Sequence, residues 1–172
     1  MKNLTKYAAA PLAMAASFAL PASAIAQQAD CVSRAESQAV TANLLPPLLE
    51  SAAKRCGPKL DNSSYLRTNS KQLARRLTPL ADRSLPATVR AFERIGGNPL
   101  PENETLLNFG RIAIADGITK DLDTASCDVI DRLTRELAPL PPQNFANVFA
   151  LFLEAGINGS DSSPLKVCEA RR

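Results

Sequence analysis

The sequence contains no histidine among its 172 residues. This absence excludes Ser-His-Asp and Cys-His catalysis, because both mechanisms use an imidazole as the general base. It also excludes histidine-ligated haem and the common zinc enzymes. A pair of carboxylates still supports glycoside hydrolysis where burial raises one of the two pKa values, but the spacing of the acidic residues reveals no such pair. The composition therefore favours a protein without catalytic residues.

Closely spaced cysteines are absent as well. The four cysteines are Cys31, Cys56, Cys127 and Cys168, and no Cys-x-x-Cys pair occurs among them. A zinc site and a redox-active pair both favour that close spacing, so the sequence predicts neither a metal nor a cofactor. An even number of cysteines in an exported chain instead predicts two structural disulfides.

Long apolar runs are absent beyond the N-terminus. Residues 1–26 have the pattern of a signal peptide: two lysines precede a short apolar run, and a small-x-small cleavage motif ends at Ala26. A second motif ending at Ala24 places the cut slightly earlier, and an uncleaved N-terminal anchor is the alternative interpretation. We expect cleavage before Gln27 and export to the periplasm of a Gram-negative bacterium or to the medium. Residues 27–172 should then form a single helical domain without a transmembrane segment.

Sustained two-residue alternation of β-branched residues is also absent, so the sequence predicts an all-α fold. Aromatic residues make up only 5% of the chain, and three of its six phenylalanines lie in residues 142–155. This stretch begins at a proline suited to the first helical turn, and its apolar residues surround most of the helix. We expect a compact bundle of about five to seven short helices around a buried helix 142–155, stapled by two disulfides.

A proline pair sets the expected ends of the first two helices. A helix capped by Asp30 should end at Pro46 and Pro47, where a tight corner would begin a second helix that ends at Cys56. Such a hairpin would bring Cys31 and Cys56 together. One straight helix would instead hold them roughly 37 Å apart at the helical rise, too far for a bond.

The second disulfide is predicted partly by elimination and partly from similar geometry. Cys127 opens a helix, and the buried helix from Pro142 should return toward that end of the bundle. The polar tail that follows then has the length to bring Cys168 to Cys127. The expected pairs are Cys31–Cys56 and Cys127–Cys168.

Further prolines divide the middle of the chain. The pattern predicts a helix that begins at Ser63 or Ser64 and is punctuated near Pro79, and a separate helix that begins at Pro86 and ends at a Gly-Gly pair. Residues 124–138 have the clearest amphipathic pattern, with apolar residues on one side and oppositely charged pairs at four-residue spacing on the other.

The net charge is small but unevenly distributed. The chain carries +3, and removal of its two leader lysines leaves about +1, which argues against nucleic-acid binding. Eight basic and three acidic residues lie within residues 59–94. Arg67, Lys71 and Arg75 share one side of a helix, with Arg76 beside them. This basic stripe is a candidate site for an anionic partner, either a lipid headgroup or an acidic protein; the alternative is a solvated face partly paired with the acidic half of the molecule.

Three short motifs are incomplete. Ser51 and Lys54 match the S-x-x-K pattern of penicillin-binding proteins, but the accompanying S-D-N and K-T-G elements are missing. Asp121 and Asp123 begin like a calcium loop whose required glycine and final glutamate are replaced. Glu36 and the serine after it resemble the Glu-Ser pair of lytic transglycosylases, but the Gly-Leu-Met-Gln element of those enzymes is absent. None of these motifs is assigned a catalytic or metal-binding role.

These observations favour an exported, non-catalytic protein that acts by binding or as an accessory of the cell envelope. Its expected partner is an envelope protein or an anionic surface rather than nucleic acid. A protein-directed inhibitor or immunity-type factor is the alternative, since small disulfide-stapled domains suit that work. A small peptidoglycan hydrolase is a third possibility, which would require a carboxylate pair.

Overall fold

The computed structural model describes residues 31–101, 103–158 and 166–168. The predicted signal peptide, residues 1–26, lies outside these ranges, as does most of the polar tail before Cys168. Within them the chain forms five α-helices, a short 3₁₀ turn and two very short strands. The helices are α1 (Arg34–Cys56), α2 (Tyr65–Gly96), α3 (Glu104–Thr119), α4 (Thr124–Leu137) and α5 (Pro142–Asn158), the turn is η2 (Gly57–Lys59), and the strands are β1 (Cys31–Val32) and β2 (Lys166–Val167). The predicted all-α bundle with two disulfides is confirmed.

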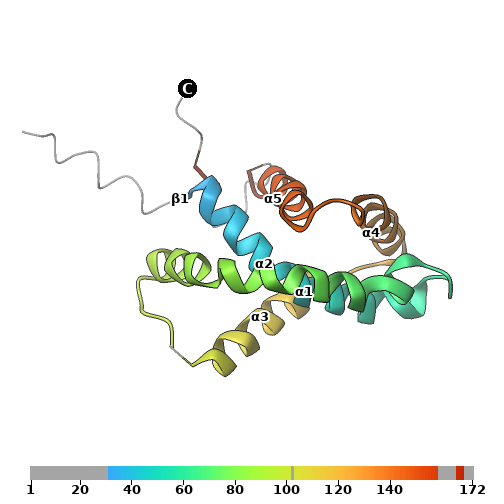
Figure 1. Ribbon diagram of the computed structural model, residues 1–172, viewed down its shortest axis with the longest axis horizontal. Coiled ribbons are helices and arrows are strands. Elements are labelled where there is room, and N and C mark those ends of the chain that lie inside the picture. The colour runs from blue at the N-terminus through green and yellow to red at the C-terminus, as the bar shows by residue number, and fades with distance from the viewer. Residues whose placement is uncertain (1–30, 102, 159–165, 169–172) are drawn as a thin grey trace, which may run out of the picture.

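The two longest helices, α1 and α2, form the frame of the bundle. α2 runs back along α1, and in the view of Figure 1 α3 lies on one side of this pair while α4 and α5 lie on the other. α1 packs against each of the other four helices. Its leucines at 45 and 49 join those at 73 and 77 of α2 in one core cluster, to which Phe145 of α5 also belongs.

The predicted break at Pro46 and Pro47 is wrong, because α1 continues through both residues to Cys56. A proline inside a helix costs roughly 3 kcal/mol, since it lacks the N–H that the helix needs and its ring crowds the preceding turn. Both prolines are buried in the interior, between Leu45 and Leu49, which are only 1% and 3% exposed. The packing of this segment therefore outweighs its poor local helix propensity.

α2 is also longer than predicted, because Pro79 and Pro86 lie inside it. The two prolines are seven positions apart, so both fall on the same side of the helix, and both are exposed. The carbonyl groups that lose their helical partners therefore face water, which can satisfy them. The helix begins after Ser64 and ends at Gly97, whose left-handed φ of 68° suits glycine.

Both predicted disulfide pairs are wrong. The bonds are Cys31–Cys168 and Cys56–Cys127. The expected hairpin does not form, because α1 is continuous and places Cys31, just before its first turn, at the opposite end from Cys56. Cys31 bonds Cys168 near the N-terminus of α1, and Cys56 bonds Cys127 at the C-terminus of α1.

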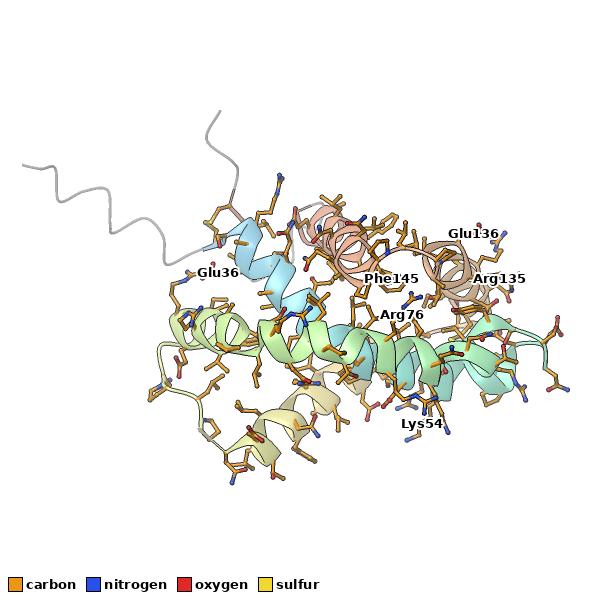
Figure 2. All side chains as sticks on the ribbon, viewed as in Figure 1. Glu36, Lys54, Arg76, Arg135, Glu136 and Phe145 are labelled. Atoms are coloured by element: carbon orange, nitrogen blue, oxygen red, sulfur yellow. A yellow bond between two sulfur atoms is a disulfide. The ribbon has the colours of Figure 1, made fainter. Side chains whose placement is uncertain are left out.

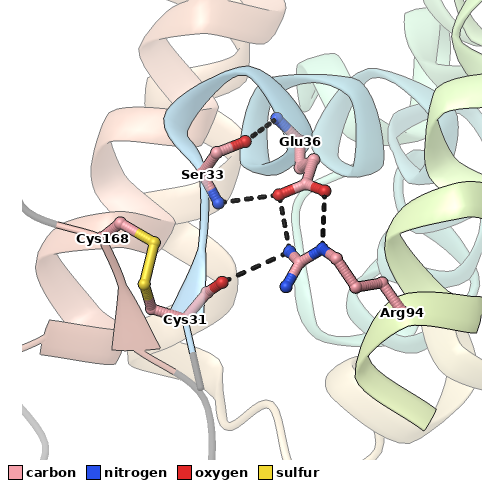
Figure 3. Close-up of a disulfide and its surroundings, with 5 residues drawn as sticks. All are labelled: Cys31, Ser33, Glu36, Arg94 and Cys168. Carbon is pink, nitrogen blue, oxygen red and sulfur yellow. Dashed lines mark hydrogen bonds and ion pairs between the residues drawn. A yellow bond between two sulfur atoms is a disulfide. The ribbon is translucent and has the colours of Figure 1, made fainter. Parts of the chain in front are cut away.

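The first of these bonds lies in a cluster that joins the N-terminus of α1 to the end of α2. Ser33 caps α1 and forms a reciprocal capping box with Glu36, and Arg94 of α2 binds the Glu36 carboxylate at 2.7 Å (Figure 3). The Cys168 amide donates to the Val32 carbonyl at 2.8 Å, beside the short parallel pairing of β1 with β2. The described C-terminal segment is thus held against the start of α1.

α5 is only partly covered, contrary to the expectation of a helix buried on nearly all sides. Phe145 points into the bundle and is fully buried, and its ring stacks on Phe149 with centroids 4.9 Å apart (Figure 2). Further along α5, in its second half, Leu151 and Phe152 are more than half exposed. The helix that the others surround is α1.

α4 is held by a buried carboxylate as well as by Cys127. Asp131 is 4% exposed; its Oδ1 accepts from the Leu66 backbone N–H at 2.7 Å and its Oδ2 from Arg135 at 2.6 Å. Leu66 lies in the first turn of α2, where the Ser64 side chain makes no capping hydrogen bond. Asp131 thus caps α2 from a neighbouring helix.

Candidate functional site

A basic groove lies between the last turns of α1 and the first half of α2. Its volume is about 710 Å³, and Leu66, Ala53 and Pro58 contribute apolar surface to it. Four cationic side chains and one acidic side chain line it. The cations are Lys54, Arg67, Lys71 and Arg75, and the acid is Glu50.

The periodicity of α2 explains three of these cations. Arg67, Lys71 and Arg75 recur every four residues and share one side of the helix, as the sequence predicts. Leu66 and Ser70 lie next to them and are buried, so the basic side chains stand at the edge of the contact with α1. The helix therefore presents its charges along the groove.

Lys54 is the groove residue that the sequence analysis missed. It lies on the last turn of α1, where a cation also interacts favourably with the helix dipole. No local pattern relates it to the α2 stripe, because only the antiparallel packing of the two helices brings them to one groove. The S-x-x-K pattern had singled it out for a different reason.

The charge of the groove is largely uncompensated. Within the described part of the chain, Lys54, Lys71 and Arg75 form no ion pair and no side-chain hydrogen bond, and all three are exposed. Glu50 is the single acid along the lining. Concentrating cations in a concave site raises the local positive potential and attracts anionic groups.

Arg67 has a structural role in addition to its charge. Its Nη1 donates to the carbonyl groups of Gly57 and Leu60, at 2.8 and 3.2 Å. Gly57 begins η2 and Leu60 directly follows it, and this turn connects α1 to the loop before α2. Arg67 therefore braces one end of the groove, and a substitution there would change the shape of the turn as well as its charge.

Arg76 does not line the groove. Its guanidinium group donates to the carbonyls of Ala138 and Leu140, just beyond the end of α4. In Figure 2 it lies on the side of α4 and α5, whereas Lys54 projects from the other side of the α1–α2 pair. The structure thus divides the predicted stripe into a groove-lining set and one residue that satisfies helix-terminal carbonyls.

The serine and the lysine of the S-x-x-K pattern are used toward different neighbouring helices. The Ser51 hydroxyl donates to Asp116 at 2.5 Å and shares a hydrogen bond with Thr119 at 2.7 Å, both residues of α3. Ser51 is 6% exposed, whereas Lys54 lines the groove toward α2. Ser51 joins α1 to α3, and its hydroxyl bonds to Asp116 and Thr119 rather than to Lys54.

Glu36 is committed to the capping box. Burial opposes the charge of this carboxyl group, but hydrogen bonds from Arg94 and Ser33 outweigh that effect and hold the pKa of Glu36 below its ordinary value. A general acid for glycoside hydrolysis needs the opposite shift, because it must carry a proton near neutral pH. The geometry around Glu36 therefore supports a structural role.

The two aspartates of the calcium-like motif, Asp121 and Asp123, have different roles. Asp123 caps α4 and accepts a hydrogen bond from the Ser126 N–H at 2.7 Å, and the hydrogen bonds from Ser126 lower the pKa of Asp123. Asp121 is exposed and lies 3.8 Å from Lys120. No cluster of three or more metal-binding side chains occurs in the ranges that the structure covers.

Comparison with known proteins adds no relative to this picture. No protein-family model matches the chain, and neither curated proteins nor solved structures show significant similarity to it. Of the helices described above, none has both the length and the apolar character needed to cross a membrane.

Proposed function

We propose that the protein is an exported, non-catalytic binding protein whose basic groove holds an acidic segment of a partner protein. The observation that carries this proposal is the set of four cations lining one groove, three of them without an ion-pair partner in the described residues. The positive potential of these side chains repels other cations, and an anionic group bound there would neutralise their charge. The preferred occupant is therefore anionic.

The shape of the groove favours a protein segment over a membrane surface. A bilayer surface is broad and flat, so it contacts side chains on a flat or convex face of a protein. These cations instead line a concave groove of about 710 Å³. Ala53 and Pro58 supply apolar contact area between the charges. An extended chain with several Asp or Glu residues would place its carboxylates near Lys54, Lys71 and Arg75 while its backbone follows the groove.

Export is supported by the cysteines and by the predicted leader. All four cysteines are bonded, and disulfides persist in oxidising compartments such as the bacterial periplasm. We therefore place the protein in the periplasm of a Gram-negative bacterium or outside the cell. A partner there would be an envelope protein, and an inhibitor or immunity-type role is the special case in which that partner is an enzyme or toxin.

The proposal is tested by titrating the protein with a short glutamate-rich peptide and, separately, with vesicles containing phosphatidylglycerol. The variant replaces Lys54, Lys71 and Arg75 by glutamine and keeps Arg67, which braces η2. We expect salt-sensitive peptide binding by the native protein and a loss of roughly tenfold or more in the variant.

The matched control replaces Arg83, Arg90 and Arg132 by glutamine. These residues are also exposed and form no ion pair in the described chain, but they lie outside the groove. The control should bind within about twofold of the native protein. Equal losses in both variants, or binding to the vesicles alone, would show that the groove is not a peptide site.

A further inference from the structure

A second cavity, separate from the basic groove, lies between α1, the C-terminal half of α2 and α3. Its volume is about 370 Å³, within the range of small-molecule sites in proteins. α3 packs on α1 and has few or no close contacts with α2, so a wedge of space separates α2 from α3. Apolar side chains from all three helices line this space: Leu44, Leu85, Val89, Phe92, Leu106 and Ile114.

A fully buried amide also lines this cavity and keeps one atom without a partner. Asn43 is 0% exposed, and its Nδ2 donates to the Ala81 carbonyl at 2.9 Å. Because a carbonyl accepts hydrogen bonds only from the NH₂ group, this bond fixes the orientation of the amide. Its Oδ1 is buried without a hydrogen-bond partner. A buried acceptor left unpaired is costly. Asn43 has no exposed surface, so a ligand donor reaches this atom only when neighbouring side chains of the cavity wall move, and the new hydrogen bond would remove the cost.

Arg111 lies where this cavity adjoins a second, more polar hollow between α2 and α3. Arg111 is half-buried and lines both spaces, and its Nε is buried with no hydrogen-bond partner. Asp82 and Glu104 line the polar hollow, but neither forms an ion pair with Arg111. The apolar cavity thus has a buried acceptor in its wall and, among the residues that the structure describes, a guanidinium group without an ion pair at its border.

We propose that this cavity binds a small amphipathic carboxylic acid that carries a hydroxyl or amide N–H on an apolar chain. The chain would occupy the space between α2 and α3. The carboxylate would pair with Arg111, and the donor would reach Asn43 Oδ1. A hydroxylated medium-chain fatty acid has this combination of groups. The site is independent of the basic groove and does not rest on the function proposed for it.

Two glycines of α3 allow a cavity-filling substitution and a matched control. Gly110 lines the cavity and Gly117 does not, and a Cβ added at either position would meet no atom within 4 Å. Glycine disfavours helix formation relative to leucine, so a leucine at either position should also favour the helix. Gly110→Leu therefore fills the cavity without threatening the fold, and Gly117→Leu is its matched control.

The disulfide-bonded protein is titrated by calorimetry with 10-hydroxydecanoate, with decanoate and with the methyl ester of 10-hydroxydecanoate. We expect binding of the hydroxy acid, and binding weaker by roughly tenfold for each probe that lacks the hydroxyl or the charge. Gly110→Leu should abolish binding, and Gly117→Leu should leave Kd unchanged.

Arg111→Gln provides a second measurement that does not depend on filling the cavity. It should weaken binding of the hydroxy acid by roughly tenfold and leave the ester unaffected, so that the variant no longer distinguishes the two probes. Unchanged binding in Gly110→Leu, or an Arg111→Gln variant that still prefers the acid to the ester, would overturn the proposal, as would a native protein that binds none of the probes.

Discussion

Cys56, the last residue of α1, is bonded to Cys127 in the first turn of α4, and both side chains are fully buried with their Cα atoms 5.3 Å apart. This bond fixes α4 against the end of α1 that carries Lys54. Asp131, one turn further along α4, then caps the start of α2. The two walls of the basic groove are thus positioned by a third helix that contributes nothing to its lining.

Peptide mapping without reduction should recover one peptide that joins Cys56 to Cys127 and another that joins Cys31 to Cys168. The continuous α1 requires this pattern, because it holds Cys31 and Cys56 at opposite ends of a helix that is about 34 Å long at the usual rise per residue. Mass spectrometry of the proteolysed protein decides it. A peptide that joins Cys31 to Cys56 would mean that α1 is broken at its proline pair.

Asp131→Ala should lower the free energy of unfolding by about 2–3 kcal/mol. The substitution leaves the Leu66 N–H without its acceptor in a buried place and removes the partner of Arg135. Chemical denaturation measures the change. Asp128→Ala, an exposed position on the same helix, should alter stability by less than about 0.5 kcal/mol, and a similar loss in both variants would contradict the capping role.

Substitutions at Arg76 and Arg75 should differ in their effect on stability, although the two residues are neighbours in sequence. Arg76→Gln removes donors from the carbonyls of Ala138 and Leu140 and should cost about 1–2 kcal/mol of stability. Arg75→Gln should leave stability within about 0.5 kcal/mol, because exposed, unpaired charges contribute little to folding. Thermal unfolding of the two variants compares them directly, and equal Tm values would show that the Arg76 contacts do not stabilise the fold.

The stability contributed by Glu36 should depend on pH in the acidic range. Its pKa lies below the ordinary value of 4.5 because the hydrogen bonds from Arg94 and Ser33 outweigh burial. A carboxyl group whose pKa is lower in the folded protein stabilises the fold above its unfolded pKa, and this contribution is lost as the pH falls through the folded value.

Glu36→Gln should therefore be less stable than the native protein at neutral pH, and the difference should shrink as the pH falls below 4.5. Denaturation curves measured over this range test the prediction. Glu136→Gln, at an exposed glutamate without a hydrogen bond in the described residues, is the control. A difference for Glu36→Gln that stays constant down to strongly acidic pH would contradict the assigned contacts.

Export should remove the predicted signal peptide. The intact mass of the protein recovered from the periplasm or the medium should correspond to a chain that begins at Gln27, or near it if the motif ending at Ala24 is used. Recovery of the whole chain, residues 1–172, in the membrane fraction would instead support an N-terminal anchor.

Several local features of the fold were predictable because they depend on residues close in sequence. The end of α2 at Gly97 follows from a glycine that accepts a left-handed conformation. Its start after Ser64 agrees with the expected position, although Asp131 of α4, and not the Ser64 side chain, supplies the capping hydrogen bond. The boundaries of α4 follow from its amphipathic pattern, and structure and prediction agree to within a residue. The alignment of Arg67, Lys71 and Arg75 needs only the helical period.

The continuity of α1 was not predictable in this way. Pro46 and Pro47 are strong local signals for a helix end, but packing of the flanking leucines decides the outcome. The wrong Cys31–Cys56 pair follows from that segment, and the wrong Cys127–Cys168 pair follows from it in part, because it was predicted partly by elimination. The expected burial of α5 failed for a related reason, since an apolar circumference does not say how many neighbours the bundle provides.

The amino-acid sequence by itself determined that the chain is helical, that it carries two disulfides and that three cations share one side of α2. These properties follow from composition, periodicity and local capping, each of which involves residues within a few turns of one another. Only the tertiary structure decided which cysteines bond, that Lys54 joins the stripe and that Arg76 leaves it. The same packing placed Asn43 and Arg111 around one cavity. These relations join residues on different helices, and their free energy comes from packing between helices, which no local pattern encodes.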